Sequence, residues 1–495
     1  MTTVQMANSR VVFSQLLSKA GRAHLGDTGQ AASPVVCVQG LGFVGSAMSL
    51  AVAVARNADG RSRFRVVGVD LPNADGQRRI DAVNAGSFPF ETTDLKLVLA
   101  MAAAHEAGNL VATSDAQAYE IADIVIVDVN CDVVSDEGRS RVRLEGFVAA
   151  IQVLAQRIRP GTLVIVETTV PPGTCEKVVV PEIQRVFRER GLPEDAFLLA
   201  HSYERVMPGR DYFDSIVNFW RVYSGYTEAA ADACAEFLSA VINVREFPLM
   251  RMKSPIASET AKVLENSYRA TTIAFIDEWS RFAERTGVDL FEVIDAIRVR
   301  PTHSNMRQPG FGVGGYCLTK DPLLALLAAR DILGLPDVTF PLSVKAVAIN
   351  QRMPLATLDR LEILLGGRLA GKRIVLMGVS YRSDVGDTRY SPSQTFHDAA
   401  VQRGAEVVPS DPLVRHWQEM SLDIPPGLPS FDDGRSVDAI VFAVAHVDYR
   451  DIDFQQWLGN HRPVVLDANR VLTADQMQAI RTHGCVLVSM GRGDT

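Results

Sequence analysis

The stretch best suited to chemistry joins a cysteine, a lysine and an aspartate to a glycine-rich loop. The reactive side chains are Cys317, Lys320 and Asp321, and the glycines are Gly310, Gly312, Gly314 and Gly315. Glycine lets a backbone adopt positive φ and come close to a ligand. A helical pattern starts at Leu323, and the positive end of a helix stabilises a thiolate. The pattern predicts that Cys317 is a nucleophile; the alternative is a buried cysteine in a tight turn.

A second candidate site lies near the N-terminus, where a buried strand leads into a G-x-G-x-x-G motif and a small-residue helix. The residues of the motif are Gly40, Gly42, Phe43, Val44 and Gly45. Its glycines permit a tight turn and the close approach of a pyrophosphate. The next strand ends at Asp70, whose carboxylate suits the ribose hydroxyls of NAD and would repel the 2′-phosphate of NADP. The pattern predicts an NAD-binding fold.

A third candidate site lies on one face of a long predicted helix, 255–286, which has no internal glycine or proline. Lys262 and Asn266 are four residues apart, and Arg269 follows three residues later, so they share much the same side. By themselves such residues are typical of a solvated helix face.

These segments resemble the UDP-glucose/GDP-mannose dehydrogenase family, the nucleotide-sugar 6-dehydrogenases. The sequence GFGVGGYCLTKDP, residues 310–322, resembles the active-site loop of that family. Four more segments match family motifs in the family's order: ETTVPPGT at 167–174, SYERVMPG at 202–209, ETAKVLENSYR at 259–269 and GVSYRSDVGDTRYSP at 378–392.

The resemblance implies a catalytic role for five residues. Cys317 would form a thiohemiacetal and then a thioester with C6 of the sugar. Lys262 and Asn266 would hold the C6 oxygen and the catalytic water. Asp321 and Glu204 would relay protons, with Glu204 acting in thioester hydrolysis; a structural salt bridge is the alternative for Glu204.

The resemblance also implies further contacts. Besides the glycine motif and Asp70, the predicted cofactor-binding residues are Cys131, Glu167, Thr168, Lys320 and Arg389. Cys131 stands where the family usually has a threonine, and a thiol is the weaker hydrogen-bond donor. The predicted substrate-binding residues are Glu204, Arg205, Val206, Lys262, Asn266, Arg269, Phe311, Gly312, Gly314, Gly315, Tyr381 and Arg382. Alternatively, Arg382 and Arg389 pair with Asp384 and Asp387 merely to hold their loop.

Composition excludes several other classes of function. The 495 residues are 47% hydrophobic and 22% charged, with a formal net charge of −8. This balance gives no electrostatic basis for binding nucleic acid or an anionic membrane. The six cysteines show no metal-ligand spacing, and no apolar run approaches about 18 residues. We expect a cytoplasmic protein without a signal peptide, a membrane span or a metal site.

Alternating strand and helix patterns predict an α/β protein with two Rossmann-like, doubly wound domains joined by a long central helix and a helical dimerisation domain. The expected domains are an NAD-binding domain at 34–250, a central helical domain with the catalytic loop at 251–350, and a domain binding the nucleotide sugar at 351–495. Residues 1–33 are expected to be a mobile extension. The resemblance implies a homodimer, or a higher homo-oligomer, formed through the central helix.

The function implied is the NAD-dependent, four-electron oxidation of the C6 hydroxyl of a UDP-sugar to a uronate, for polysaccharide or glycoconjugate synthesis. The segment around Glu204 resembles the branch that acts on N-acetylated hexosamines or on mannose-type sugars. Two alternatives remain open at this point. One is a two-electron dehydrogenase of the hydroxyacid type, and the other is a catalytically silent regulator that binds NAD or a UDP-sugar.

Overall fold

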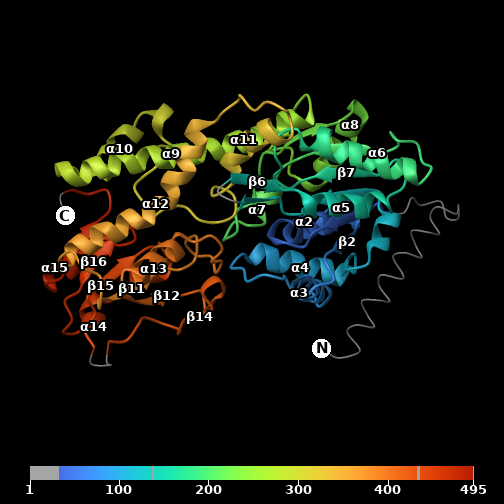
Figure 1. Cartoon of the computed structure of the whole chain (residues 1–495). Coiled ribbons are helices and arrows are strands. Elements are labelled where there is room, and N and C mark those ends of the chain that lie inside the picture. The colour runs from blue at the N-terminus through green and yellow to red at the C-terminus, as the bar shows by residue number, and fades with distance from the viewer. Residues whose placement is uncertain (1–32, 137–138, 432–434, 494–495) are drawn as a thin grey trace. The chain divides into compact units, whose positions relative to one another are not determined.

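The structure, a computed structural model, describes residues 33–136, 139–431 and 435–493 (Figure 1). It divides into two compact units. The first unit contains the described residues up to Val263 together with 324–339, and the second contains 264–323 and the described residues from Phe340 onward. The predicted extension at 1–33 lies outside the described residues, apart from Ser33.

The first unit is built on an eight-stranded sheet with the order β10-β9-β8-β7-β4-β1-β2-β3. The strands are β1 (Val35–Gln39), β2 (Arg65–Val69), β3 (Leu110–Thr113), β4 (Ile124–Val127), β7 (Leu163–Val166), β8 (Leu198–His201), β9 (Val222–Gly225) and β10 (Met250–Arg251). Six neighbouring strands of this sheet are parallel to one another: β8, β7, β4, β1, β2 and β3. The next strand, β9, runs antiparallel to β8. The strand order reverses between β1 and β4, where open α/β sheets bind ligands.

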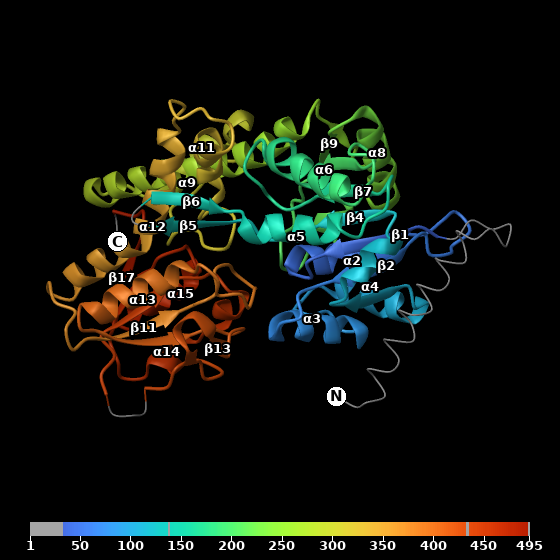
Figure 2. The same cartoon turned by 45° about the vertical axis from the view of Figure 1, so that its right-hand side comes forward.

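Helices cover both faces of this sheet (Figure 2). They are α2 (Phe43–Val54), α3 (Ala74–Asn84), α4 (Leu95–Ala107), α5 (Glu145–Ala155), α6 (Val180–Glu189), α7 (Asp214–Val217) and α8 (Glu228–Val241), with short turns η1 (Ala116–Ile121) and η2 (Cys175–Val179). Val36 and Val38 of β1 pack into one hydrophobic core, whereas Val35 and Cys37 pack into the other. This alternation of side chains is what a strand buried on both faces requires.

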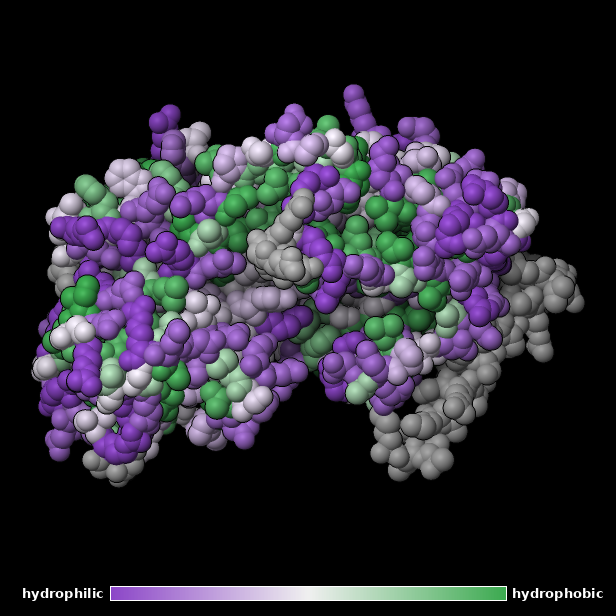
Figure 3. Space-filling model, viewed as in Figure 1, coloured by the Kyte–Doolittle hydropathy of each residue, from purple (hydrophilic) through white to green (hydrophobic). Residues whose placement is uncertain are grey.

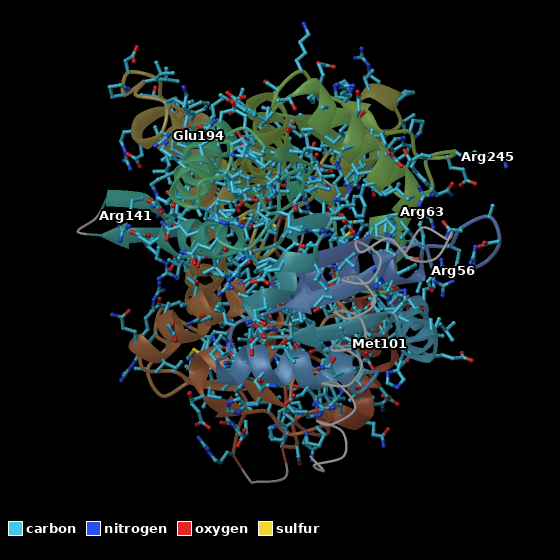
Figure 4. The ribbon with its side chains drawn as sticks, turned by 90° about the vertical axis from the view of Figure 1, so that its right-hand side faces the viewer. Arg56, Arg63, Met101, Arg141, Glu194 and Arg245 are labelled. Atoms are coloured by element: carbon cyan, nitrogen blue, oxygen red, sulfur yellow. The ribbon has the colours of Figure 1, made fainter. Side chains whose placement is uncertain are left out.

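A two-stranded hairpin, β5 (Asp132–Asp136) and β6 (Arg139–Arg143), follows β4. Arg141 lies on this hairpin (Figure 4) and pairs with Glu145 at 2.8 Å. Arg330 donates a hydrogen bond to the Ser140 carbonyl at 2.8 Å. The sequence motifs gave no indication of this hairpin.

The central helices match the predicted pattern closely. They are α9 (Pro255–Thr286), α10 (Leu290–Arg298), η3 (Pro301–His303), α11 (Asp321–Asp331) and α12 (Pro341–Leu364). The bounds of α9 are those expected from the sequence, and α11 begins immediately after the glycine-rich loop. The division between the units falls within α9 and within α11.

The second unit contains a five-stranded parallel sheet with the order β12-β11-β15-β16-β17. Its strands are β11 (Arg373–Met377), β12 (Glu406–Ser410), β15 (Ala439–Phe442), β16 (Val464–Asp467) and β17 (Val486–Ser489). The remaining elements are α13 (Pro392–Gln402), β13 (His416–Trp417), η4 (Gln418–Met420), β14 (Leu422–Asp423), η5 (Val447–Asp451), α14 (Phe454–Leu458) and α15 (Ala474–Thr482). The strand order reverses between β11 and β15. The predicted fold class, α/β with two Rossmann-like sheets, is confirmed.

Candidate active site

The turn between β1 and α2 has the shape that a dinucleotide needs. Gly40 has φ +95°, and a Cβ on it would lie 2.5 Å from the Asp128 carbonyl oxygen. A Cβ on Gly45 would lie 1.9 Å from the Gly40 carbonyl oxygen, whereas Gly42 faces open space. Gly42 caps α2 without a side-chain hydrogen bond. The turn therefore fits a pyrophosphate at the helix N-terminus.

Asp70 follows β2, as predicted, and its side chain is almost wholly buried. Its Oδ2 accepts hydrogen bonds from the Leu41 N–H at 3.1 Å and from Arg79 Nε at 2.7 Å. Arg79, on α3, is a partner that the sequence motifs did not identify. The bond from Leu41 ties the carboxylate to the glycine turn, which places it where a ribose would be recognised.

The residues after β8 form a compact charged group around a buried tyrosine. Tyr203 is 1% exposed. The guanidinium carbon of Arg205 lies 5.2 Å from the centre of its ring, and Lys262 Nζ lies 5.3 Å from it. Lys262 Nζ donates to the Glu204 carbonyl oxygen at 2.7 Å and lies 3.7 Å from Glu204 Oε1. The Glu204 carboxylate also accepts a hydrogen bond from the Val206 N–H.

Glu167 and Thr168 follow β7, and both backbone N–H groups donate to the Val127 carbonyl oxygen. The Glu167 side chain is 2% exposed and pairs with Arg221 at 2.5 Å. The sequence motifs did not identify Arg221, because it lies just before β9, a strand that was not predicted from the sequence. Cys131 is fully buried in one of the two hydrophobic cores of the first unit.

In the second unit, the glycine-rich loop packs on the segment that follows β11. A Cβ on Gly314 would lie 2.4 Å from the Tyr390 carbonyl oxygen, and one on Gly315 would lie 2.8 Å from the Tyr381 ring. The Gly315 N–H also donates to the Arg389 carbonyl oxygen at 3.2 Å. Only glycine fits at these two positions, so the loop and the Tyr381 segment hold each other in place.

Cys317 is exposed, whereas the other five cysteines, all within the described residues, are buried. Its carbonyl oxygen accepts hydrogen bonds from the Lys320 and Asp321 N–H groups at 3.2 and 2.9 Å. The loop is thus closed into a turn at the N-terminus of α11. This placement excludes the alternative of a buried structural thiol.

Asp321 is the buried centre of a second charged group. It is fully buried and accepts hydrogen bonds from Asn266 Nδ2 at 2.8 Å and Lys320 Nζ at 3.0 Å. Lys320 Nζ lies 4.2 Å from the centre of the Tyr316 ring. The structure thus brings together the predicted residues Asn266, Lys320 and Asp321. Arg269, also predicted, is exposed on α9.

The segment after β11 carries Tyr381, Arg382 and Arg389. Burial raises the pKa of Tyr381 to about 12. Arg389 pairs with Asp387 at 2.7 Å, a contact that the loop-holding alternative expects, and its side chain is 44% exposed. Phe311, predicted to bind substrate, packs its ring against Phe396 in the hydrophobic core.

A buried histidine beneath this segment was not identified from the sequence. His446 Nδ1 accepts a hydrogen bond from the Asp384 N–H at 3.0 Å, and its Nε2 lies 2.9 Å from Ser380 Oγ and 3.2 Å from Asp411 Oδ2. Asp411 directly follows β12 and His446 follows β15, the two strands on either side of β11, so both residues lie at the carboxyl ends of strands, where a nucleotide binds in open α/β sheets. His446 lies outside the sequence motifs identified above, so no sequence signal indicated it.

Across the part of the chain that the structure describes, no cluster of His, Cys, Asp or Glu side chains could hold a metal ion. No helix among the described residues is both long and apolar enough to cross a membrane.

Comparison with known proteins agrees with this geometry. Residues 35–241, 257–352 and 375–474 match the NAD binding, central and UDP binding domains of the UDP-glucose/GDP-mannose dehydrogenase family. The chain is 28% identical over 468 residues to the UDP-N-acetyl-D-mannosamine dehydrogenase of Pyrococcus horikoshii, covering 93% of this chain and 99% of that protein. It is 27% identical to the NDP-N-acetyl-D-galactosaminuronic acid dehydrogenase of Ralstonia nicotianae, covering 74% and 80%.

The solved structure of UDP-D-ManNAc dehydrogenase from Pyrococcus horikoshii superimposes with a TM-score of 0.75 at 25% identity, covering 93% of this chain and 100% of that one. The dinucleotide turn, the acid after β2 and the second Rossmann-like sheet are thus parts of a known architecture. The chain belongs to the UDP-glucose/GDP-mannose dehydrogenase family and is an NAD-dependent nucleotide-sugar dehydrogenase.

Proposed function

We propose that this enzyme oxidises the C6 hydroxyl of a UDP-N-acetylhexosamine to the carboxylate through a covalent intermediate on Cys317. The observation that carries the proposal is the exposure of this one thiol at the end of a glycine-rich loop. The UDP binding domain and the names of the relatives support a UDP-linked N-acetylated sugar.

Bound NAD+ supplies the hydride acceptor for each of the two oxidations. Between them, the Cys317 thiolate adds to the C6 aldehyde, so that a C–S bond forms and the oxygen takes a proton. Loss of the C6 hydride from this thiohemiacetal gives a thioester. Water then adds to the thioester carbonyl, the C–S bond breaks, and the uronate and the thiol are released. A thiolate suits both steps because it is a strong nucleophile near neutral pH and a good leaving group.

The neighbouring side chains have roles that follow from their charges. Lys262 is a buried cation that would stabilise negative charge on the C6 oxygen, and one such donor contributes roughly 3–4 kcal/mol to a transition state. Glu204, beside Lys262, would accept protons from water. Asn266 and Asp321 are held together by a hydrogen bond, so that the amide is oriented for its predicted contact with the sugar oxygen.

The proposal is tested by replacing the thiol. Cys317→Ala should abolish uronate formation, and mass spectrometry of wild-type enzyme quenched during turnover should show a sugar adduct on the peptide that contains Cys317. Cys485→Ala is the matched control, because Cys485 is buried before β17 and has no proposed role. A Cys317→Ala enzyme that produces uronate at the wild-type rate would overturn the proposal.

The preference for an N-acetylated sugar needs a separate experiment. NAD+ reduction should be followed with UDP-glucose, UDP-N-acetylglucosamine, UDP-N-acetylmannosamine and GDP-mannose at equal concentrations. We expect the highest kcat/KM with one of the two N-acetylated sugars. A higher value with UDP-glucose or GDP-mannose would contradict this preference while leaving the thiol mechanism intact.

A dimer formed through α9 is the second part of the proposal. Five large apolar side chains on α9 recur every three, four or seven residues and are 47–65% exposed: Leu264, Tyr268, Phe275, Trp279 and Phe282. The surface viewed in Figure 3 is largely hydrophilic, with hydrophobic residues gathered in patches. An apolar stripe at helical spacing is typical of a helix that packs against a partner.

A further inference from the structure

In the NAD-binding unit, two acids with solvent-shielded carboxyl oxygens lie at the carboxyl ends of β4 and β7, and a buried arginine lies at the start of the antiparallel strand β9. Asp128 directly follows β4, Glu167 directly follows β7, and Arg221 directly precedes β9. Arg221 Nη1 donates to Glu167 Oε1 at 2.5 Å, and both side chains are at most 3% exposed. The mechanism proposed above gives Asp128 no role.

The oxygen atoms of the two acids lack the hydrogen-bond donors that ionised carboxylates require. Both Asp128 oxygens and Glu167 Oε2 are shielded from solvent, and no donor among the described residues reaches them. Val127 and Val166 are partners in the parallel register of β4 and β7, so that Asp128 and Glu167, the next residue of each strand, lie side by side at the ends of neighbouring strands. Two ionised carboxylates offer only acceptors, so a hydrogen bond between them requires that one carries a proton.

The charges around the pair lead to the same conclusion. Burial, and next the charge of Glu167, raise the pKa of Asp128 well above its ordinary value. Burial also raises the pKa of Glu167, and Arg221 opposes that rise. Glu204, the other acid facing the pair, lies 3.7 Å from the compensating Lys262.

His201, at the end of β8, is neutral, because burial and the neighbouring Lys262 lower its pKa to about 3. With one proton on the acid pair, the whole group is therefore neutral. Without that proton, a net negative charge would be buried, which is costly.

Asp128 also lies directly against the pyrophosphate turn. Its carbonyl oxygen is 2.5 Å from the position of a Cβ on Gly40, and its own Cβ is 3.3 Å from the position of a Cβ on Gly45. A charge on Asp128 would therefore act at short range on any anion bound at the N-terminus of α2. Such a charge would offset the attraction that the helix end provides.

We propose that Asp128 is a positioning residue that shares a single proton with Glu167, and that this proton must be present for NAD+ to bind tightly. The proton makes Asp128 a donor to Glu167, which fixes the orientation of the Glu167 carboxyl group. It also removes the charge beneath the pyrophosphate turn. The inference concerns cofactor binding alone and holds whichever sugar is oxidised.

The test is calorimetric titration of the wild-type enzyme and of Asp128→Asn with NAD+, without sugar, from about pH 7 to pH 10. The wild-type Kd should rise at alkaline pH, by up to about tenfold per pH unit, because one proton must be regained on binding. The Asp128→Asn side chain would keep the shape of the protonated aspartic acid and an N–H donor toward Glu167. The Kd of this variant for NAD+ should therefore change much less with pH. Superimposable curves for the two proteins would overturn the proposal.

Asp115→Asn is the matched control. Asp115 follows β3 and accepts a hydrogen bond from the Gln117 N–H at 2.9 Å, outside the acid pair, so this variant should keep the wild-type slope. If Asp128→Asn does not fold, infrared spectra of Glu259→Gln decide the question, because burial raises the pKa of Glu259 to about 7 and would give the wild type a carboxylic-acid band of its own. A band of a protonated carboxylic acid at neutral pH that disappears at alkaline pH supports the shared proton, and the absence of such a band overturns it.

Discussion

At the scale of single residues, Asp321 is both a predicted site residue and the centre of a buried group of side chains. Its carboxylate is fully buried and accepts hydrogen bonds from Asn266 and Lys320. Asp321→Ala would leave Lys320, which is 7% exposed, without this counter-charge. Breaking a buried ion pair costs about 3–5 kcal/mol, so the denaturation midpoint in urea should fall markedly.

The control for this prediction lies on the same helix. Asp331, at the end of α11, pairs with Arg330 at 2.5 Å in a partly exposed position. Exposed pairs contribute about 0–1 kcal/mol, so Asp331→Ala should shift the midpoint only slightly. Equal shifts for the two variants would show that the Asp321 cluster does not stabilise the fold.

At the scale of elements, the first turn of α9 clamps the loop after β7. Glu259 accepts hydrogen bonds from the Gly173 and Cys175 N–H groups at 2.5 and 2.8 Å. Burial raises the pKa of Glu259 to about 7. The folded state therefore holds this proton more tightly than the unfolded chain does, so the contribution of Glu259 to stability falls as pH rises from about 4.5 through 7.

This linkage predicts a pH-dependent difference in thermal stability between the wild-type enzyme and Glu259→Gln, which cannot titrate. Between about pH 5 and pH 8, the wild type should lose up to about 3 kcal/mol relative to the variant. The difference in Tm between the two proteins, measured by calorimetry at several pH values, checks this. A difference that stays constant with pH would contradict it.

The glycine-rich loop and the segment after β11 are a second pair of interdependent elements. Gly315 has φ +79°, and a Cβ there would lie 2.8 Å from the Tyr381 ring. Gly315→Ala should therefore displace Tyr381 and raise the KM for the UDP-sugar. Gly287→Ala is the matched control: Gly287 has φ +77° but faces open space, so this variant bears only the backbone cost of about 1–2 kcal/mol. An unchanged KM in Gly315→Ala would show that this contact does not shape the substrate site.

Several of these features could be predicted from the sequence because they depend on local pattern. The glycine turn, the acid after β2 and the bounds of α9 follow from spacing and periodicity. The partners Arg221 and His446 could not be predicted, because each meets its partner only through the packing of segments that are distant in the sequence. Arg79 is only nine residues from Asp70, but its contact depends on the direction in which α3 leaves β2, which spacing alone does not give. The hairpin β5–β6 lacks both a strongly apolar pattern and the Asn-Gly or Asp-Gly dipeptide that marks a two-residue turn.

At the scale of the whole molecule, the apolar stripe on α9 predicts the oligomeric state. Trp279→Glu places a charge among the exposed side chains Phe275 and Phe282, and burying that charge in an interface would be costly. The variant should be monomeric in light scattering at concentrations where the wild type is dimeric. Trp220→Glu, at an equally exposed position on the loop before β9, is the control and should remain dimeric. A dimeric Trp279→Glu enzyme would contradict an interface through α9.

The central claim is that one enzyme carries out two successive oxidations at C6 of the same sugar. The most direct measurement is the number of NADH molecules formed for each nucleotide sugar consumed, with limiting sugar and excess NAD+ taken to completion. We expect two NADH molecules and one uronate for each nucleotide sugar. One NADH with release of the aldehyde would identify a two-electron dehydrogenase and contradict a second oxidation at C6.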